Sequence, residues 1–131
     1  MEGSILADVR SACNLEHDDN SFDAQLIPLI NSHMMMAHQF GIGMDNGFVV
    51  NGLNDTWEEW LGEHTPYLQA AKTWLGYSVL LMFDPPDNST VLKSYQDQIA
   101  KMEYMLKEKS EEKGFVKDYV PEKADFYEDD E

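Results

Sequence analysis

The stretch PYLQAAKTWLGYSVLLMF, residues 66–83, decides the fold. Thr65 is a suitable capping residue and Pro66 suits the first helical position, so a helix is predicted from here to Phe83. The sequence Asp84-Pro85-Pro86 then ends it, because a residue before proline is disfavoured in helical geometry.

This helix is predicted to be apolar on two sides. Such a helix is usually central in its fold or packs against a neighbouring subunit. The first apolar face consists of Leu68, Ala71, Leu75, Val79 and Met82. The second face consists of Trp74, Tyr77 and Leu81, and we expect these three side chains to lie at a subunit interface.

Two helices are predicted before this one. Residues 5–14 form the first, with Ser4 as N-cap. Residues 22–40 form the second, in which Pro28 removes a backbone hydrogen bond at a cost of about 3 kcal/mol and predicts a kink or a late start. The buried stripe of the first helix is Leu6, Val9 and Cys13. That of the second is Leu26, Ile30, His33, Ala37 and Phe40, widened by Ile27 and Met34.

Between these helices and residue 66 the pattern changes. Residues 41–55 carry the turn dipeptides Asn46-Gly47 and Asn51-Gly52, which predict a short β excursion or an ordered loop. Thr56 followed by Glu59 is a capping-box pattern for one or two helical turns that end at Gly62.

A last helix is predicted from Ser89 or Thr90 to about Lys107. Its narrow apolar seam has 3, 4, 3, 4 spacing and consists of Leu92, Tyr95, Ile99, Met102 and Leu106. The sequence thus predicts an all-α protein, a bundle of about four helices with the excursion near 41–55. Residues 1–108 form the body and residues 109–131 an acidic tail that is extended or flexible when free.

The charge balance limits the possible functions. Among 131 residues, Asp and Glu outnumber Lys and Arg by 25 to 9, and the net charge is -16. A chain with so few cations cannot displace many counterions from nucleic acid, so sequence-specific DNA binding is not expected. The longest apolar run, residues 79–83, is far shorter than the ~20 residues that a membrane span needs, so no membrane partner is expected.

No pattern of catalytic or metal-binding residues is present in the sequence. The histidines lack any metal-ligand spacing, and Asp18, Asp19, Asn20 and Asp23 fail the calcium-loop pattern. Cys13 is the only cysteine, so neither an intrachain disulfide nor a thiolate cluster can form. We therefore expect no enzyme activity and no cofactor. Met34-Met35-Met36 offers a plastic binding surface, although core burial of Met34 with the other two at a flank is favoured.

The tail admits two interpretations. A run of charge commonly serves solubility alone. Here, however, aromatic and branched residues are spaced through the run, and such residues are suitable anchors for folding onto a partner. The anchors of the predicted docking arm are Phe115, Val116, Tyr119, Val120, Phe126 and Tyr127.

Several stretches taken in order resemble the head–tail connector (adaptor, or head-completion) proteins of tailed bacteriophages. The resemblance covers about residues 4–106, and its most specific block runs from Lys72 to Pro86. Two departures are Tyr104, where the family pattern leads us to expect tryptophan, and Pro28 in the second helix. The stretches are residues 5–10, 21–32, 56–62, 68–86 and 98–106.

This resemblance implies a structural subunit without catalytic residues. It implies a homo-oligomeric ring, usually twelve-fold, that docks under the portal, extends the DNA channel and offers the tail an attachment surface. The expected partners are the portal, a tail-proximal neck or stopper protein, and genomic DNA that passes without specific binding. The expected location is the virion neck, after assembly in the cytoplasm of the host bacterium.

Two alternatives remain open from the sequence. A tail-completion or tail-terminator protein is a related virion role, but more strand would be expected there. An acidic mimic of DNA that inhibits a host DNA-binding enzyme would explain the charge, although it does not require helices rich in aromatic residues. Mixing the protein with purified portal and with DNA-binding enzymes would distinguish these functions.

Overall fold

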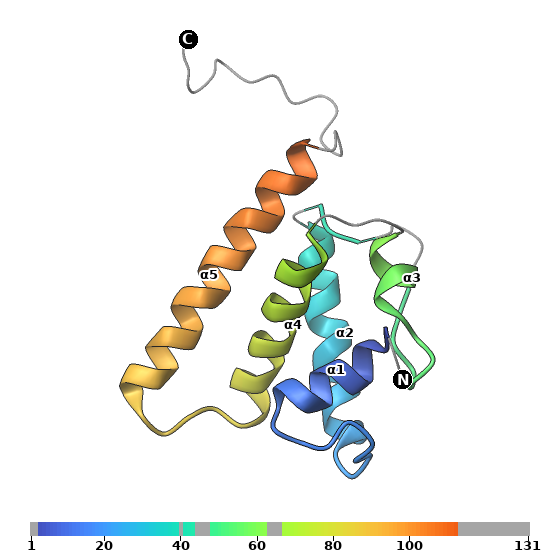
Figure 1. Ribbon diagram of the computed structural model, residues 1–131, viewed down its shortest axis with the longest axis vertical. Coiled ribbons are helices and arrows are strands. Elements are labelled where there is room, and N and C mark those ends of the chain that lie inside the picture. The colour runs from blue at the N-terminus through green and yellow to red at the C-terminus, as the bar shows by residue number, and fades with distance from the viewer. Residues whose placement is uncertain (1–2, 40, 44–47, 63–66, 113–131) are drawn as a thin grey trace.

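Helices are the only regular elements in the described part of the chain. Figure 1 shows the computed structural model, which describes residues 3–39, 41–43, 48–62 and 67–112. Within these ranges no strand is present, so the prediction of an all-α protein is confirmed. The helices in chain order are α1 (Ile5–Ala12), α2 (Asp23–Gln39), α3 (Trp57–Leu61), α4 (Leu68–Phe83) and α5 (Ser89–Glu112).

The central helix is α4, as the two-sided apolar pattern predicts. It packs against α1, α2 and α5, and in Figure 1 it lies between α5 and α2. Its first turn begins at Leu68, whereas the predicted start, Thr65 and Pro66, lies outside the described residues. Met82 was expected on the core face but is 65% exposed, because it lies in the last turn of α4. The buried residues of α4 are Ala70, Ala71, Trp74, Leu75, Gly76, Ser78, Val79 and Leu80.

The first helix follows its prediction closely. The Ser4 hydroxyl oxygen accepts a hydrogen bond from the backbone N–H of Ala7 at 3.2 Å, which confirms Ser4 as the N-cap. The predicted stripe of Leu6, Val9 and Cys13 is buried. These apolar side chains place α1 against α4, with which it shares a close contact.

The second helix begins at Asp23 and continues through Pro28, so it does not start late. Met34 is buried, whereas Met35 and Met36 are exposed, which confirms the division expected for the three methionines. His33 is only half-buried, and Phe40 lies outside the described residues. The buried stripe of α2 is Leu26, Ile30, Met34 and Ala37.

The segment between α2 and α3 is a loop in its described residues, 41–43 and 48–55, so the β excursion is not found there. Asn31 of α2 holds this loop in place. Its side-chain amide donates to the Val50 carbonyl at 3.0 Å, and its side-chain oxygen accepts from the Val50 N–H at 2.8 Å. This pair of bonds imitates backbone pairing and keeps Val50 fully buried.

The predicted capping box of α3 is present. The Thr56 hydroxyl accepts from the Glu59 N–H at 3.1 Å, and the Glu59 carboxylate accepts from the Thr56 N–H at 2.9 Å. Gly62 follows the helix with φ of 90°, a left-handed value that favours glycine. An isolated antiparallel bridge pairs Thr56 with Ser4, so it joins the start of α3 to the start of α1.

The last helix is longer than predicted. It begins at Ser89, as expected, but continues through Glu112, past the expected end near Lys107 and the predicted body boundary at residue 108. Figure 1 shows it alongside α4 at one edge of the molecule. Leu106 is fully buried, whereas the other four members of the predicted seam are only partly buried. A helix covered on one side only keeps much of its surface for other contacts.

A close approach of α1 and α4 depends on Gly76. A Cβ atom at this position would lie 2.9 Å from the Ala12 Cβ, closer than real Cβ contacts. We predict that Gly76→Val lowers the free energy of unfolding by about 1–3 kcal/mol, because the two helices must separate. Urea denaturation monitored by circular dichroism measures the change.

The matched control for this prediction is Gly52→Val, because a Cβ there meets nothing within 4 Å. A double-mutant cycle of Gly76→Ala with Ala12→Gly adds a second check, since the second change removes the opposing methyl group. The account of the α1–α4 contact fails if Gly76→Val is no more disruptive than the control, or if the cycle shows no favourable coupling.

Candidate functional site

The N-terminal half of the body is held together by a buried cation that the sequence analysis did not identify. The Arg10 side chain is 2% exposed and forms a two-point ion pair with Asp23, with contacts of 3.1 Å and 2.6 Å. A third nitrogen of the guanidinium group donates to the His17 carbonyl at 2.7 Å. Arg10 therefore joins α1, the following loop and the start of α2. The sequence did contain a signal for this buried cation: Arg10 lies four positions after Leu6, on the buried side of α1.

A second polar cluster joins α1, α3 and α4. The indole N–H of Trp57 donates to the Asp8 carboxylate at 2.7 Å. The Lys72 ammonium lies 3.6 Å from the same carboxylate and 5.9 Å from the centre of the Trp57 ring. The Lys72 ammonium is therefore paired with groups of its own chain.

The three residues predicted at a subunit interface are placed differently from one another. Trp74 is 1% exposed and lies edge-on to His33 at a ring distance of 5.9 Å, so the chain's own core buries it. Tyr77 is half-buried and contacts Tyr95 of α5 at a ring distance of 4.8 Å. Leu81 is also half-buried. On the second apolar face of α4, Tyr77 therefore contacts α5 and Trp74 contacts α2 of the same chain.

The six anchors of the predicted docking arm lie outside the described residues. They are Phe115, Val116, Tyr119, Val120, Phe126 and Tyr127.

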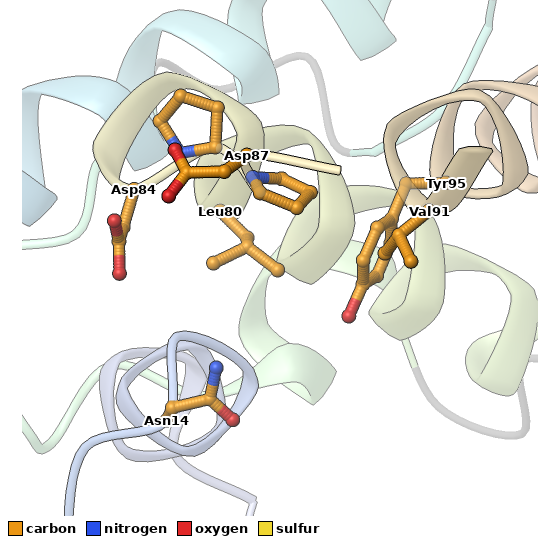
Figure 2. A pocket seen from close by; sticks show the side chains of 8 residues that line it. Asn14, Leu80, Asp84, Asp87, Val91 and Tyr95 are labelled. Atoms are coloured by element: carbon orange, nitrogen blue, oxygen red, sulfur yellow. The ribbon is translucent and has the colours of Figure 1, made fainter. Parts of the chain in front are cut away.

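A hollow of about 330 Å³ lies where α4 turns into α5. Figure 2 shows Asn14 across this hollow from Asp84 and Leu80, with Val91 and Tyr95 along a further side. Burial, and to a lesser extent the carboxylate of Asp84, raises the pKa of the Cys13 thiol to about 11. Cys13 is therefore a neutral core residue at ordinary pH. The remaining lining residues are Pro85, Pro86 and Asp87.

A second groove of about 300 Å³ runs between α4 and α5. Tyr77 of α4 and four residues of α5 line it: Val91, Ser94, Tyr95 and Gln98. The lining contains no charged side chain, which distinguishes the groove from most of the surface of this acidic protein.

Charge is divided unevenly along the chain. Residues 1–88 hold 13 of the 25 acidic residues but only two of the nine Lys and Arg residues. Those two, Arg10 and Lys72, both interact with carboxylates of the same chain. Residues 89–112, which form α5, hold five acidic and four basic residues. The body before α5 is therefore strongly acidic, whereas α5 is nearly neutral.

The acidic loop before α2 has a structural role. Asp23 is paired with Arg10. Asp19 accepts a hydrogen bond from the Ser21 N–H at 2.9 Å, and hydrogen bonds from the side chain and backbone of Ser21 lower its pKa.

In the described part of the chain no cluster of His, Cys, Asp and Glu could hold a metal ion. Nor does any helix described by the structure have the length and apolar character to cross a membrane.

The comparison with protein families identifies the kind of protein that this chain is similar to. The family model described as phage connector protein matches residues 5–113, which is most of the chain. A search of curated proteins and a search of solved structures found no match. The matched range includes all of the described helices, and it ends one residue after α5.

The Arg10–Asp23 pair provides a test of how the body is held together. We predict that Asp23→Ala lowers the free energy of unfolding by roughly 3 kcal/mol, because it leaves a buried guanidinium group without its carboxylate. Thermal and urea unfolding measure the effect. The control is Asp97→Ala, which breaks an exposed pair with Lys93 and should cost no more than about 0.5 kcal/mol. Similar losses in the two variants would contradict the structural role of Arg10.

Proposed function

The chain belongs to the phage connector protein family, and on this premise we propose that it forms a ring beneath the portal of a tailed phage. Its family is a structural one, and the connector role places it at the junction of head and tail in the virion neck. The observation that carries the proposal is the family match over residues 5–113. The ring would extend the DNA channel and give a tail-proximal neck or stopper protein its attachment surface.

The all-α architecture is consistent with this role. A tail-terminator protein would be expected to contain strands, and none is present in the described part of the chain. Ring subunits need surface for contacts on two different sides, since head-to-tail contacts close into rings. The exposed sides of α5 and α2 provide such surfaces. A twelve-fold ring would match the usual symmetry of a portal.

We assign portal docking to the tail after α5. Its six anchors are separated by charged residues, a pattern suited to a segment that folds onto a partner. Because α5 runs through Glu112, the segment available for docking begins at about residue 113. The body would then build the ring and the tail would attach the ring to the portal.

The proposed channel wall would be acidic. A negative wall repels the phosphate backbone and keeps DNA from adhering during passage, and the net charge of -16 supports this role. DNA would then be a passing cargo and not a specifically bound partner.

Tail docking can be tested with a deletion variant and a full-length substitution variant. We predict that deleting residues 113–131 leaves a folded helical body with lost or strongly weakened binding to the portal encoded by the same phage. Replacing the six anchors by serine should weaken binding as strongly, because this change keeps every charge but removes the apolar contacts. Binding is measured by biolayer interferometry or co-sedimentation, and helical content by circular dichroism.

The matched control replaces the four C-terminal residues, Glu128 to Glu131, by Gln or Asn and keeps the anchors. It should bind nearly as well as the natural chain. Full binding after the deletion would exclude the docking arm, and loss of binding in the control but not in the serine variant would show that charge carries the contact instead.

The acidic-channel proposal predicts a kinetic effect. Reversing the charge of several Asp and Glu residues that line the lumen of the assembled neck should slow DNA ejection, because cations there would bind phosphates. Fluorescence measurement of ejection from purified virions reports the rate. Reversal of as many acidic residues on the outer side of the ring is the control, and unchanged ejection in the lumen variant would count against an electrostatic role.

A further inference from the structure

Two helices carry exposed stripes that their roles in the fold do not explain. On α5, five exposed residues follow one another at spacings of 3, 4, 3 and 4, beside the seam that faces α4. We call this the α5 outer stripe: Val91, Ser94, Gln98, Lys101 and Met105. On α2 and the residue before it, the same spacing recurs outside the buried stripe. We call this the α2 outer stripe: Phe22, Gln25, Leu29, Ser32 and Met36.

The α5 outer stripe forms one wall of a groove. Val91, Ser94 and Gln98 line the hollow of about 300 Å³ whose other wall includes Tyr77 of α4. Farther along the helix, Met105 is 45% exposed and Val91 at the opposite end is 43% exposed. The stripe therefore has apolar residues at its ends and polar residues between them. Spacings of 3 and 4 keep all five on one side of a helix, as in the contact seam of a coiled coil.

The α2 outer stripe has the same plan. Phe22 is 39% exposed and packs edge-on to Phe83, and Met36 is 49% exposed at the other end. Gln25 and Ser32 are exposed between them, and Leu29 is half-buried. Both stripes span fifteen residues, from 22 to 36 and from 91 to 105, so they have equal length on two helices that pack on α4.

Charge indicates what covers these stripes. Copies of a chain with a net charge of -16 repel one another, so they can approach only through surfaces with few carboxylates. The ten residues of the two stripes include no acidic residue and one cation, Lys101. Lys101 is exposed and complements the acidic loop of Glu16, Asp18 and Asp19 that leads into α2.

We propose that the α5 outer stripe of one copy packs on the α2 outer stripe of the next copy. This inference rests on the ring proposed above and names the surfaces that form it. The contact is heterologous, because two different patches meet, so it leaves a free patch of each kind on a dimer and can continue until a ring closes.

The charges also select the direction of packing. In an antiparallel arrangement, Lys101 and Met105 lie near Phe22 and the acidic loop that precedes it. Ser94 then lies opposite Ser32, and Val91 lies opposite Met36. In a parallel arrangement, Ser94 would lie opposite Gln25, and Lys101 would lie far from the loop. Both arrangements bring apolar ends together, so the cation decides between them, and only the antiparallel contact brings Lys101 to the acidic loop.

The test uses cysteine pairs in the full-length chain on its portal. Cys13 is buried, with a pKa raised to about 11, so it does not compete for mild oxidation. The variant Ser94→Cys with Ser32→Cys should give a ladder of disulfide-linked oligomers on non-reducing gels. Each single variant should give none, because its partner position has no thiol.

The alternative contacts have distinct results. A ladder from Ser94→Cys with Gln25→Cys, in place of the first pair, would overturn the antiparallel arrangement. Dimers from Ser94→Cys alone would show a symmetric α5–α5 contact and overturn the proposal. If negative-stain microscopy shows a ring but neither cysteine pair forms a cross-link, the α5–α2 contact is wrong and the proposed ring still holds. If no ring forms on the portal, the proposed function itself is contradicted.

A charge variant gives an independent readout. Lys101→Glu should weaken self-association on the order of tenfold or more, because it faces the acidic loop with another carboxylate. Lys93→Glu makes the same change in net charge outside the stripe, where Lys93 is paired with Asp97 at 3.4 Å, and should leave association nearly unchanged. Analytical ultracentrifugation measures both, and equal effects would show that net charge alone governs association.

Discussion

A helix with apolar side chains on nearly every side must be covered on nearly every side, and α4 imposes this condition on the rest of the chain. Ala71, Leu75 and Val79 are fully buried, and Trp74 is 1% exposed. Burial of one such aliphatic side chain contributes about 1.5–3 kcal/mol, so the arrangement around α4 is the main source of stability. The helices α1, α2 and α5 supply the cover, and Gly76 allows α1 to approach closely.

The two sides of α4 are covered with different degrees of completeness. On the side of α1 and α2, polar contacts reinforce the packing: Arg10 with Asp23, Asp8 with Trp57, and Asn31 with Val50. On the other side α5 is attached through a seam of which only Leu106 is fully buried. The described part of the chain therefore consists of an acidic body whose helices are joined by polar contacts and a long, nearly neutral helix with an exposed side. This division suits a subunit that must bind copies of itself.

Much of the fold could be predicted from the sequence because its signals are local. The Ser4 cap, the capping box at Thr56 and the period of the α5 seam depend on residues a few positions apart, and all three are present. The exposure of Met82 could not be predicted, since periodicity does not show where cover by neighbouring helices ends. Periodicity likewise does not show that Trp74 is 1% exposed within its own chain.

The candidate site was less accessible to prediction. Arg10 and Asp23 are thirteen residues apart, and their ion pair depends on how α1 and α2 meet. The outer stripes became visible only when the burial of each helix was known, because polar residues such as Ser94 and Gln98 carry no apolar signal in the sequence. The tail anchors rest on composition and on their position after the range that matches the family, and they remain a prediction.

The central claim is that this chain forms a ring at the portal through contacts between different sides of α5 and α2. A cryo-electron reconstruction of the virion neck tests it most directly. The account predicts a closed ring of copies directly beneath the portal, with α5 of each copy antiparallel to α2 of its neighbour. A neck that lacks this chain, or that holds it in a ring whose subunits meet through other surfaces, would contradict the account.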